Sequence, residues 1–262
     1  MVTKYLGITG PKKSGKTTTI ETIVPKLIEK GYKVGTVKIA FKAVSIDVNK
    51  EHYDVVRLRE SKPHKTLFKS KIETVIFINE DKTLRQALKD FGKGLDFVLL
   101  EGFKEDLEGF PQIVLLKEKG QEEEFVDGFT AIITSIPEFS IKSKDPRYIT
   151  FDKLDSIIEH VALPLFPELN CEHCGYKTCF DLTKDVIVGK KTVEDCYVIA
   201  SEDANLVLSV NDKIVPCNPF VQDIIRNILL GFLKTLKVEE QEIKDVELKM
   251  SFTKTEGDMS SE

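Results

Sequence analysis

The sequence predicts an α/β protein in which helices flank a mostly parallel β-sheet, followed by a smaller domain that carries most of the cysteines. Short apolar and β-branched runs alternate with helical patterns along residues 1–165, and such alternation is typical of parallel strands joined by helices. Four of the five cysteines lie between residues 171 and 196. We therefore expect one domain at 1–165, a second at 166–236 and an acidic, polar tail at 237–262.

The charge balance and the distribution of apolar residues exclude several classes of protein. The chain has 38 Lys and Arg against 43 Asp and Glu, a net charge of −5, so it offers no overall basic surface to nucleic acid. The first residues form a predicted strand rather than a cleavable apolar segment, and the apolar run at 228–233 is too short to span a bilayer. We expect a cytoplasmic protein without a membrane segment, whose clustered cysteines bind a metal or cluster rather than form disulfides.

A phosphate-binding pattern lies near the start of the chain. Residues 10–17, GPKKSGKT, fit G-x-x-x-x-G-K-T, and they lie between a predicted strand at 5–9 and a helical pattern. Lys12 and Lys13 are expected to contact phosphate or to remain surface charges. The predicted nucleotide-binding residues are Gly10, Pro11, Lys12, Lys13, Ser14, Gly15, Lys16, Thr17 and Thr18.

The roles of these residues follow from the negative charge of a nucleoside triphosphate. Gly10 and Gly15 let the backbone wrap around phosphates, and Lys16 reaches the β- and γ-phosphates. The Thr17 hydroxyl binds Mg²⁺. Glu101 ends a run of four apolar residues, where such folds keep a second acidic group for Mg²⁺ or its water; a helix cap or a solvated carboxylate is the alternative. We assign catalytic roles to Lys16 and Glu101, and Mg²⁺ ligation to Thr17 and Glu101.

The other elements of the first domain are predicted from apolar runs and helical spacing. Strands are expected at residues 33–40, 74–78, 97–103, 111–116 and 130–134, and helices at 83–91 and 152–161. Pro164 and Pro167 mark the end of the domain. With the phosphate loop after its first strand, the sheet is predicted to be of the P-loop NTPase type.

Four cysteines form a second motif. Cys171, Cys174, Cys179 and Cys196 are spaced C-x₂-C-x₄-C-x₁₆-C, and a helical pattern at 180–189 returns the chain to the fourth. Four thiolates suit either zinc or an iron–sulfur cluster. Structural zinc sites usually use two separate C-x₂₋₄-C pairs, whereas three adjacent ligands and a remote one are typical of [4Fe–4S] domains. We predict that the four cysteines bind a [4Fe–4S] cluster, with Zn²⁺ as the alternative.

The rest of the second domain is predicted to be a hairpin and a long helix. Alternating strands at 206–217 end at Cys217, which we expect to be a buried thiol. The helix begins at Pro219 and carries a regular apolar stripe. Further leucines widen this stripe enough to predict contact with the first domain or with a second subunit, so a homodimer is one candidate assembly.

Three segments of the first domain carry a specific pattern: GITGPKKSGKTT at 7–18, GYKVGTVK at 31–38 and LLEGFK at 99–104. With them, residues 1–165 resemble the MobB family, the GTP-binding proteins of molybdopterin guanine dinucleotide synthesis. Members carry K-H-x-x-H after the second strand; here Lys38 is kept, while Ile39 and Lys42 replace the two histidines. The family's Gly and Ala-Gly-Ala are lost. Three further family residues align if two residues are inserted: Asp47, Asp54 and Arg57.

The cysteine segment NCEHCGYKTC, residues 170–179, resembles a small iron–sulfur domain known from corrinoid and electron-transfer proteins. The shared pattern is N-C-x-x-C-G-Y-x-T-C followed by a helix, Gly and D-C. Besides the cysteines, the residues that fit it are Asn170, Gly175, Tyr176, Thr178, Gly189 and Asp195. This resemblance also implies a [4Fe–4S] cluster.

The MobB resemblance implies a GTP-binding protein and slow Mg²⁺-dependent GTPase of molybdenum or tungsten pterin guanine dinucleotide biosynthesis. It also implies a molybdopterin nucleotidyltransferase as the partner. The sequence has no N-K-x-D segment that would specify guanine, so GTP follows from the resemblance, and no residue stands out as an activating arginine. A partner or a second subunit would then supply the missing charge.

Two alternative functions follow from the same motifs. The first is a non-catalytic, nucleotide-gated adaptor or carrier whose cluster is redox-active or structural. The second is a P-loop small-molecule kinase with a structural zinc domain. Kinases of this fold usually cover the phosphates with an arginine-bearing lid, yet Arg147 is the only arginine between residues 104 and 165.

Overall fold

The computed structural model describes residues 2–40, 53–80, 82–200, 208–210, 213–215 and 219–236. The chain divides into two compact units, Met1–Ala204 and Asn205–Glu262. The domain bounds drawn from the sequence after residues 165 and 236 stay a prediction. The predicted roles of Lys42, Asp47 and Cys217, and of the tail at 237–262, lie outside the described residues.

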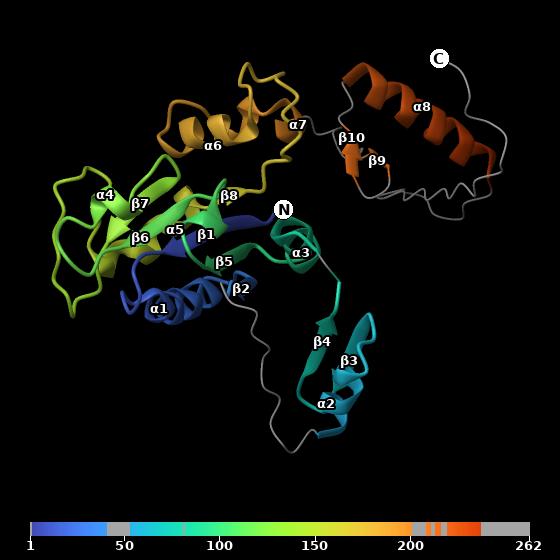
Figure 1. Cartoon of the computed structure of the whole chain (residues 1–262). Helices are drawn as coiled ribbons and strands as arrows, with labels where there is room; N and C mark the ends of the chain where they lie inside the picture. Colours follow the sequence, from blue (N-terminus) through green and yellow to red (C-terminus); the bar gives the residue numbers. More distant parts are fainter. Residues whose placement is uncertain are drawn as a thin grey trace, which may run out of the picture. The chain divides into compact units, whose positions relative to one another are not determined.

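In the described part of the first unit, five parallel strands form the central sheet (Figure 1). They are β1 (Lys4–Thr9), β2 (Val34–Lys38), β5 (Phe97–Glu101), β6 (Gln112–Leu115) and β7 (Thr130–Thr134). Their order is β2-β5-β1-β6-β7, and every neighbouring pair is parallel. β8 (Leu163–Pro164) pairs antiparallel with the amino end of β1. The predicted, mostly parallel sheet is confirmed, and the carboxyl ends of its strands meet at one edge.

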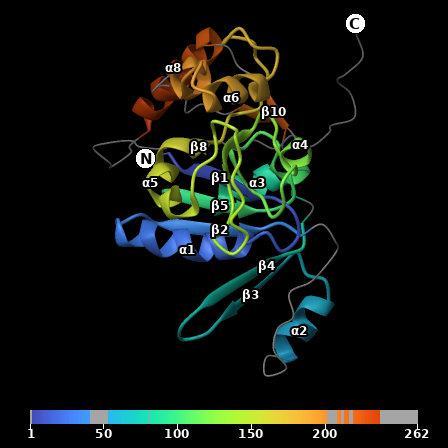
Figure 2. The same cartoon turned by 90° about the vertical axis from the view of Figure 1, so that its left-hand side faces the viewer.

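Helices cover both faces of this sheet (Figure 2). Leu27 of α1 and Ile158 of α5 share a buried cluster with Leu6 of β1. On the opposite face, Leu88 of α3 is buried with Tyr5. Successive residues of β1 therefore face opposite layers, which explains why this strand is buried from Tyr5 to Thr9. The helices span α1 (Lys16–Glu29), α3 (Leu84–Phe91) and α5 (Leu154–Val161).

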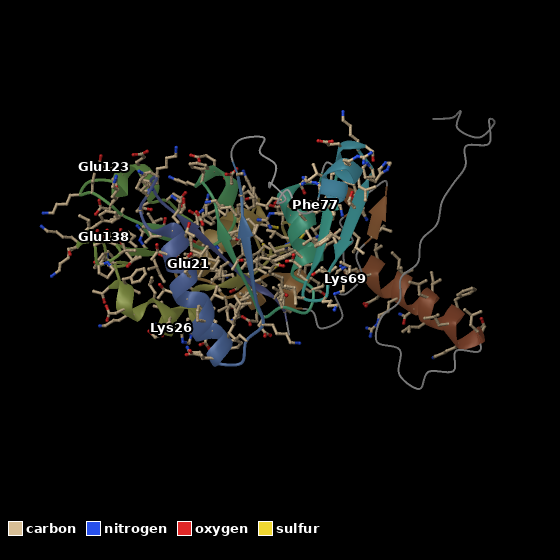
Figure 3. The ribbon with its side chains drawn as sticks, turned by 90° about the horizontal axis from the view of Figure 1, so that it is seen from below. Glu21, Lys26, Lys69, Phe77, Glu123 and Glu138 are labelled. Carbon is tan, nitrogen blue, oxygen red and sulfur yellow. The ribbon has the colours of Figure 1, made fainter. Side chains whose placement is uncertain are left out.

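A hairpin separate from the main sheet corrects one sequence prediction. Residues 74–78 form the expected strand, β4, but it pairs antiparallel with β3 rather than joining the parallel sheet. The reason is the short connection, in which the amide of Ser70 donates to the carbonyl oxygen of Glu73 at 2.9 Å, since parallel pairing needs a long crossover. Phe77 lies on β4 (Figure 3), and Cζ of Arg59 in α2 is 4.1 Å from the centroid of its ring. The elements span α2 (Tyr53–Glu60), β3 (Lys65–Lys69) and β4 (Thr74–Ile78).

The cysteine segment is the last part of the first unit. Its predicted helix is present as α6, which begins after Thr178, whose hydroxyl accepts a hydrogen bond from the amide of Asp181 at 3.1 Å. Leu182 of α6 is buried in one cluster with Leu163 and Phe166, so this segment packs beside the end of β8. Its helices are α6 (Cys179–Ile187), the 3₁₀ turn η4 (Val193–Asp195) and α7 (Tyr197–Ala200).

The second unit contains the predicted hairpin and long helix. β9 (Leu208–Val210) and β10 (Lys213–Val215) pair antiparallel, and α8 runs from Pro219 to Thr235. Ile228 and Phe232 of α8 are exposed, and the contact of this face with the first domain or a second subunit stays a prediction. Within the described ranges, no helix combines the length and the apolar character needed to cross a membrane.

Candidate functional site

The phosphate-binding loop joins β1 to α1 at the carboxyl edge of the sheet. Gly10 and Gly15 have φ angles of 136° and 93°, in the left-handed region that favours glycine. A Cβ atom at Gly10 would lie 2.4 Å from the carbonyl oxygen of Leu115, and one at Gly15 would lie 2.6 Å from Cγ2 of Ile136. Backbone conformation and close packing therefore both require glycine at these two positions.

Lys16 is the first residue of α1, and its side chain folds back over the loop. Its Nζ donates to the carbonyl oxygens of Gly10 at 2.8 Å and Pro11 at 2.7 Å. Burial lowers the pKa of Lys16, and the nearby carboxylate of Glu101 opposes this shift. The ammonium group is thus held at the loop, where phosphate oxygens would replace the carbonyl oxygens as acceptors.

Thr17 and Glu101, which the sequence assigns to Mg²⁺, are in direct contact. Thr17 Oγ1 donates to Glu101 Oε2 at 2.9 Å. Glu101 ends β5, is the register partner of Ile8 in β1, and is only 6% exposed. Because β5 and β1 are neighbours, the strand end places this carboxylate beside the first turn of α1. The structure therefore brings the two predicted ligands together.

A second cation contacts Glu101 from the next strand. Lys38 ends β2 and is the register partner of Glu101 in β5. Lys38 Nζ forms an ion pair with Glu101 Oε1, and the amide of Ile39 donates to the carbonyl oxygen of Glu101 at 2.8 Å. The side chain of Lys38 is 64% exposed against 8% for Glu101. The carboxylate is therefore the buried partner, and the lysine reaches it from the solvent side.

A cavity of about 500 Å³ lies beside the phosphate loop and these strand ends. This volume is in the usual range for small-molecule sites, and open α/β sheets bind ligands at this edge. Glu138 lies on the segment after β7 (Figure 3) and is one of the lining residues. The cavity is lined by residues 12–18 of the loop and by Lys38, Ile39, Ala40, Glu101, Gly102, Phe103, Ile136 and Glu138.

The side chains of this cavity fit a nucleoside triphosphate with Mg²⁺. Ser14 Oγ is buried and has no hydrogen-bond partner within the described residues, so a phosphate oxygen would satisfy an otherwise unpaired hydroxyl. Lys12 and Lys13 add charge of the right sign. The hydroxyl of Thr17 and the carboxylate of Glu101 are the hard oxygen ligands that Mg²⁺ prefers.

Three of the four clustered cysteines come together around α6. Cys179 begins α6 and Cys196 directly precedes α7; both are buried, and Cys174 packs against them. The amide of Cys179 donates to Asn170 Oδ1 at 2.9 Å. Burial raises the pKa of the Cys196 thiol, and backbone hydrogen bonds at Ile199 and Val198 oppose this shift. Cys171 lies outside this cluster, and all four are free thiols.

The thiols form a suitable donor set without forming a metal site by themselves. Within the residues that the structure describes, no group of three or more His, Cys, Asp or Glu side chains is arranged to hold a metal ion. Thiolates are soft ligands that suit an iron–sulfur cluster or zinc. Ligation of a cluster by these four cysteines therefore stays a prediction, which their residue type and partial clustering support.

Arg85 of α3 joins the cysteine segment to the central sheet. Its Nε pairs with Glu168 Oε1 at 2.5 Å, and Nη1 donates to the carbonyl oxygen of Phe166 at 3.2 Å. Its Cζ lies 4.8 Å from the ring centroid of Phe110 and 5.5 Å from that of Phe180. Burial lowers the pKa of Arg85, and the carboxylate of Glu168 opposes this shift. One partly buried cation thus links a helix of the sheet domain to residues on both sides of the cysteine loop.

Sequence relatives cover nearly the whole chain. A family model described as “MobB: Molybdopterin guanine dinucleotide synthesis protein B” matches residues 5–136. The “Putative molybdopterin-guanine dinucleotide biosynthesis adapter protein” of Methanocaldococcus jannaschii is 32% identical over 253 residues, 95% of this chain and 98% of that protein. The chain belongs to the MobB family.

Further comparisons give the extent of the MobB likeness. The “Molybdopterin-guanine dinucleotide biosynthesis adapter protein” of Haemophilus influenzae is 32% identical over 117 residues, 44% of this chain and 64% of that protein. The crystal structure of Bacillus subtilis MobB covers 57% of this chain and 90% of its own, with 22% identity and a TM-score of 0.47. A second family model, described as “Putative Fe-S cluster”, matches residues 166–198, the segment that holds all four clustered cysteines.

The sequence alone does not place every residue of this MobB cavity. The sequence does indicate Lys38, because it is the retained lysine of the family's K-H-x-x-H segment. Its neighbour Ile39 also lines the cavity. The first replaced histidine position therefore lines this cavity. Ile136 and Glu138 have no comparable signal, since only the folded sheet brings the segment after β7 against Gly15.

Proposed function

We propose that this MobB protein is a GTP-binding adapter of molybdopterin guanine dinucleotide biosynthesis, and that it hydrolyses GTP slowly with Mg²⁺. The observation that carries the proposal is the contact between Thr17 and Glu101 beside Lys16, in a cavity of about 500 Å³. The names of the Methanocaldococcus jannaschii and Haemophilus influenzae relatives support the pathway and the adapter role. A molybdopterin nucleotidyltransferase is the partner in this proposal, for a molybdenum or tungsten cofactor.

The residues of the cavity have separate roles in binding the triphosphate. Lys16 exchanges loop carbonyl oxygens for phosphate oxygens, and the buried hydroxyl of Ser14 donates to phosphate. Thr17 and Glu101 would hold Mg²⁺, which when bound neutralises charge on the phosphoryl oxygens. Glu101 also orients water at the strand end, because its carboxylate is fixed by its partners.

Slow hydrolysis is expected from the charges that line the cavity. Its described lining contains lysines but no arginine. A bidentate arginine is the group that accelerates phosphoryl transfer most in related mechanisms. A partner protein or a second copy of the chain that inserts an arginine would therefore raise the rate, and turnover would be coupled to assembly.

The proposal includes a [4Fe–4S] cluster on Cys171, Cys174, Cys179 and Cys196, with a redox or structural role. The family model over residues 166–198 and the thiol donor set support it. The test is iron, zinc and acid-labile sulfide analysis on protein purified without oxygen. About four irons and four sulfides per chain are expected. One zinc without sulfide would replace the cluster with a structural zinc ion.

Nucleotide binding is tested with Lys16→Ala in the full-length protein. The variant should lose at least about 100-fold in affinity for GTP, because each charge-assisted bond to phosphate contributes about 1.5–3 kcal/mol. Isothermal titration with GTP, GDP and ATP measures this loss and the preference for guanine. Lys26→Gln, a charge removal on the same helix, is the control and should bind like wild type. Unchanged GTP binding by Lys16→Ala would contradict the proposal.

The adapter role is tested with the nucleotidyltransferase itself. Wild-type protein should increase the yield of the guanine dinucleotide cofactor and should hydrolyse GTP faster in the presence of the enzyme. Lys16→Ala should do neither. GTP binding with negligible turnover, even with the enzyme present, would favour the non-catalytic nucleotide-gated adapter. No effect on cofactor yield would contradict the pathway assignment.

A further inference from the structure

We propose that Lys38 is a catalytic residue of the proposed GTPase: it leaves Glu101, contacts the γ-phosphate and stabilises the charge that develops there during hydrolysis. This inference rests on the proposed function and deepens it. It concerns a residue that the phosphate-binding motif does not contain, on a strand two positions away from β1 in the sheet.

The sheet fixes the backbone of Lys38 beside the reaction centre. Lys38 and Glu101 are register partners of adjacent parallel strands, and the next amide, that of Ile39, donates to the carbonyl oxygen of Glu101 at 2.8 Å. Glu101 in turn accepts from Thr17 at 2.9 Å. The position of Lys38 relative to the predicted Mg²⁺ ligands is therefore set by a β-ladder rather than by a loop.

The environment of the pair allows the lysine to exchange partners. Glu101 is buried and keeps its hydrogen bond from Thr17 when the lysine leaves. The side chain of Lys38 is 64% exposed, so rotation of its four-carbon stem meets solvent rather than packed core. A triphosphate in this cavity carries more negative charge than one carboxylate, which favours transfer of the ammonium group to phosphate.

Lys38 approaches the cavity from a different side than the other cations. Lys12, Lys13 and Lys16 all belong to the phosphate loop, whereas Lys38 comes from β2. Lys38 is also close enough to Lys16 to contribute to lowering its pKa. The two ammonium groups are thus placed to act on one phosphate chain, from the loop and from the sheet edge.

The reaction requires water as the co-reactant and no oxidant or reductant. The water oxygen forms a bond to Pγ, the bond from Pγ to the bridging oxygen breaks, and that electron pair remains on the β-phosphate of GDP. The proton of the attacking water passes to the released phosphate. Lys38 remains protonated throughout and donates to γ-phosphoryl oxygens, where negative charge shifts in the transition state. A lysine is a point charge without a bidentate fork, which is consistent with slow turnover.

A purely structural role for Lys38 predicts a different result. A lysine that only balances the charge of Glu101 would affect the stability of the fold and the affinities for GDP and GTP together. A lysine that contacts the γ-phosphate in the transition state affects the hydrolysis rate, while GDP, which lacks that phosphate, binds as before. The change in hydrolysis rate relative to the change in GDP affinity therefore separates the two roles.

The test compares wild type with Lys38→Gln, Lys38→Met and Lys38→Arg in the full-length protein. Single-turnover hydrolysis of saturating GTP with Mg²⁺ should slow about 100-fold in the first two. Lys38→Arg should stay within about tenfold of wild type because it keeps the charge. GDP affinity should change less than about threefold in all three variants. Lys26→Gln is the control, and thermal melting establishes that each variant is folded.

The outcomes separate this inference from the proposed function. Wild-type hydrolysis rates in folded Lys38→Gln or Lys38→Met would overturn the role of Lys38 while leaving GTP binding intact. An equal loss of GDP and GTP affinity with an unchanged rate would also overturn it. If Lys38→Gln fails to fold, the other two variants decide. GTP hydrolysis by Lys38→Arg that is as slow as hydrolysis by Lys38→Met would also overturn the role of Lys38. A wild-type protein that does not bind GTP would overturn both proposals.

Discussion

The nucleotide site and the cysteine segment differ in how far the chain assembles them by itself. At the candidate nucleotide site, Glu101 at the end of β5 already contacts Thr17 in the first turn of α1 and Lys38 at the end of β2. In the cysteine segment, Cys174, Cys179 and Cys196 pack together, but no described group of side chains is arranged to hold a metal. A β-sheet can preorganise a site through its register, whereas a loop with few backbone pairings would take up the geometry of a metal site only on binding the metal.

Removal of one buried thiol should have the largest effect and would sharpen this contrast. Cys179→Ser should lose its iron and unfold the cysteine segment, because metal binding contributes on the order of 10 kcal/mol to the folding of small cysteine domains. GTP affinity should stay within about threefold, since distant sites contribute independently. Iron analysis, thermal melting and GTP titration of the same sample measure all three quantities.

The control for this experiment is Cys217→Ser, which leaves the four clustered cysteines intact and should keep its iron. Normal iron content in Cys179→Ser would remove Cys179 from the ligand set. Loss of GTP binding in Cys179→Ser would break the comparison, because the nucleotide site would then depend on the metal as well.

A change in the phosphate loop should have the next largest effect. Gly10→Ala places a Cβ 2.4 Å from the carbonyl oxygen of Leu115 at a φ angle of 136°. We expect a loss of about 2–5 kcal/mol in the free energy of unfolding, from left-handed strain of about 1–2 kcal/mol and overpacking of about 1–3 kcal/mol. Urea denaturation measures the loss, and GTP titration should show that binding is lost while iron content is unchanged.

Gly94→Ala is the matched control for Gly10→Ala. Gly94 has a φ angle of 78° but no neighbouring atom within 4 Å of an added Cβ. It should therefore lose only the backbone component of about 1–2 kcal/mol and bind GTP normally. Equal destabilisation of the two variants would show that close packing against Leu115 contributes nothing to the loop.

The smallest of the three effects is expected where the two regions meet. Arg85→Gln removes a largely buried cation that pairs with Glu168 and contacts the rings of Phe110 and Phe180. Because the side chain of Glu168 is 36% exposed and partly hydrated, we expect a loss of about 1–3 kcal/mol rather than the larger cost of a fully buried pair. Thermal melting measures it.

Lys30→Gln is the comparison for Arg85→Gln, because the ion pair between Lys30 and Glu159 is surface-exposed and should contribute little to stability. If Arg85→Gln were as mild as Lys30→Gln, the junction would not hold the cysteine segment on the sheet domain. The covalent chain would then be the main connection between the cysteine segment and the sheet domain.

The comparison also explains what the sequence predicts and what it does not. β1, β5, β6 and β7 are apolar runs, and α1 follows a motif of known geometry, so pattern and spacing are sufficient for them. The place of residues 10–18 and Glu101 at the carboxyl edge of the sheet is predictable for the same reason, and their role in nucleotide binding stays a prediction. Contacts that depend on sheet order are not: Lys38 meets Glu101 only because β2 and β5 are neighbours, although 62 residues separate the two in the sequence.

Short segments account for the remaining difficulty. The strand at 74–78 is five residues long. Its length and composition fit a strand of a parallel sheet as well as a strand of a hairpin, so they do not distinguish the two. Arg85 gives no sign in the sequence that Glu168 will be its partner. Both cases need the tertiary structure, because the deciding information is which distant segment lies alongside.

The ring of Phe180, described above beside Arg85, also meets Phe129 edge to face with their centroids 5.9 Å apart. Phe110 and Phe129 are almost completely buried, and part of that cover comes from residues after 165. A shortened protein that ends at the sheet domain's last strand would expose these rings and the Arg85 guanidinium to water. The nucleotide domain, although its motif is self-contained, would then be prone to self-association. The cysteine segment in this sense shields apolar rings of the sheet domain from water.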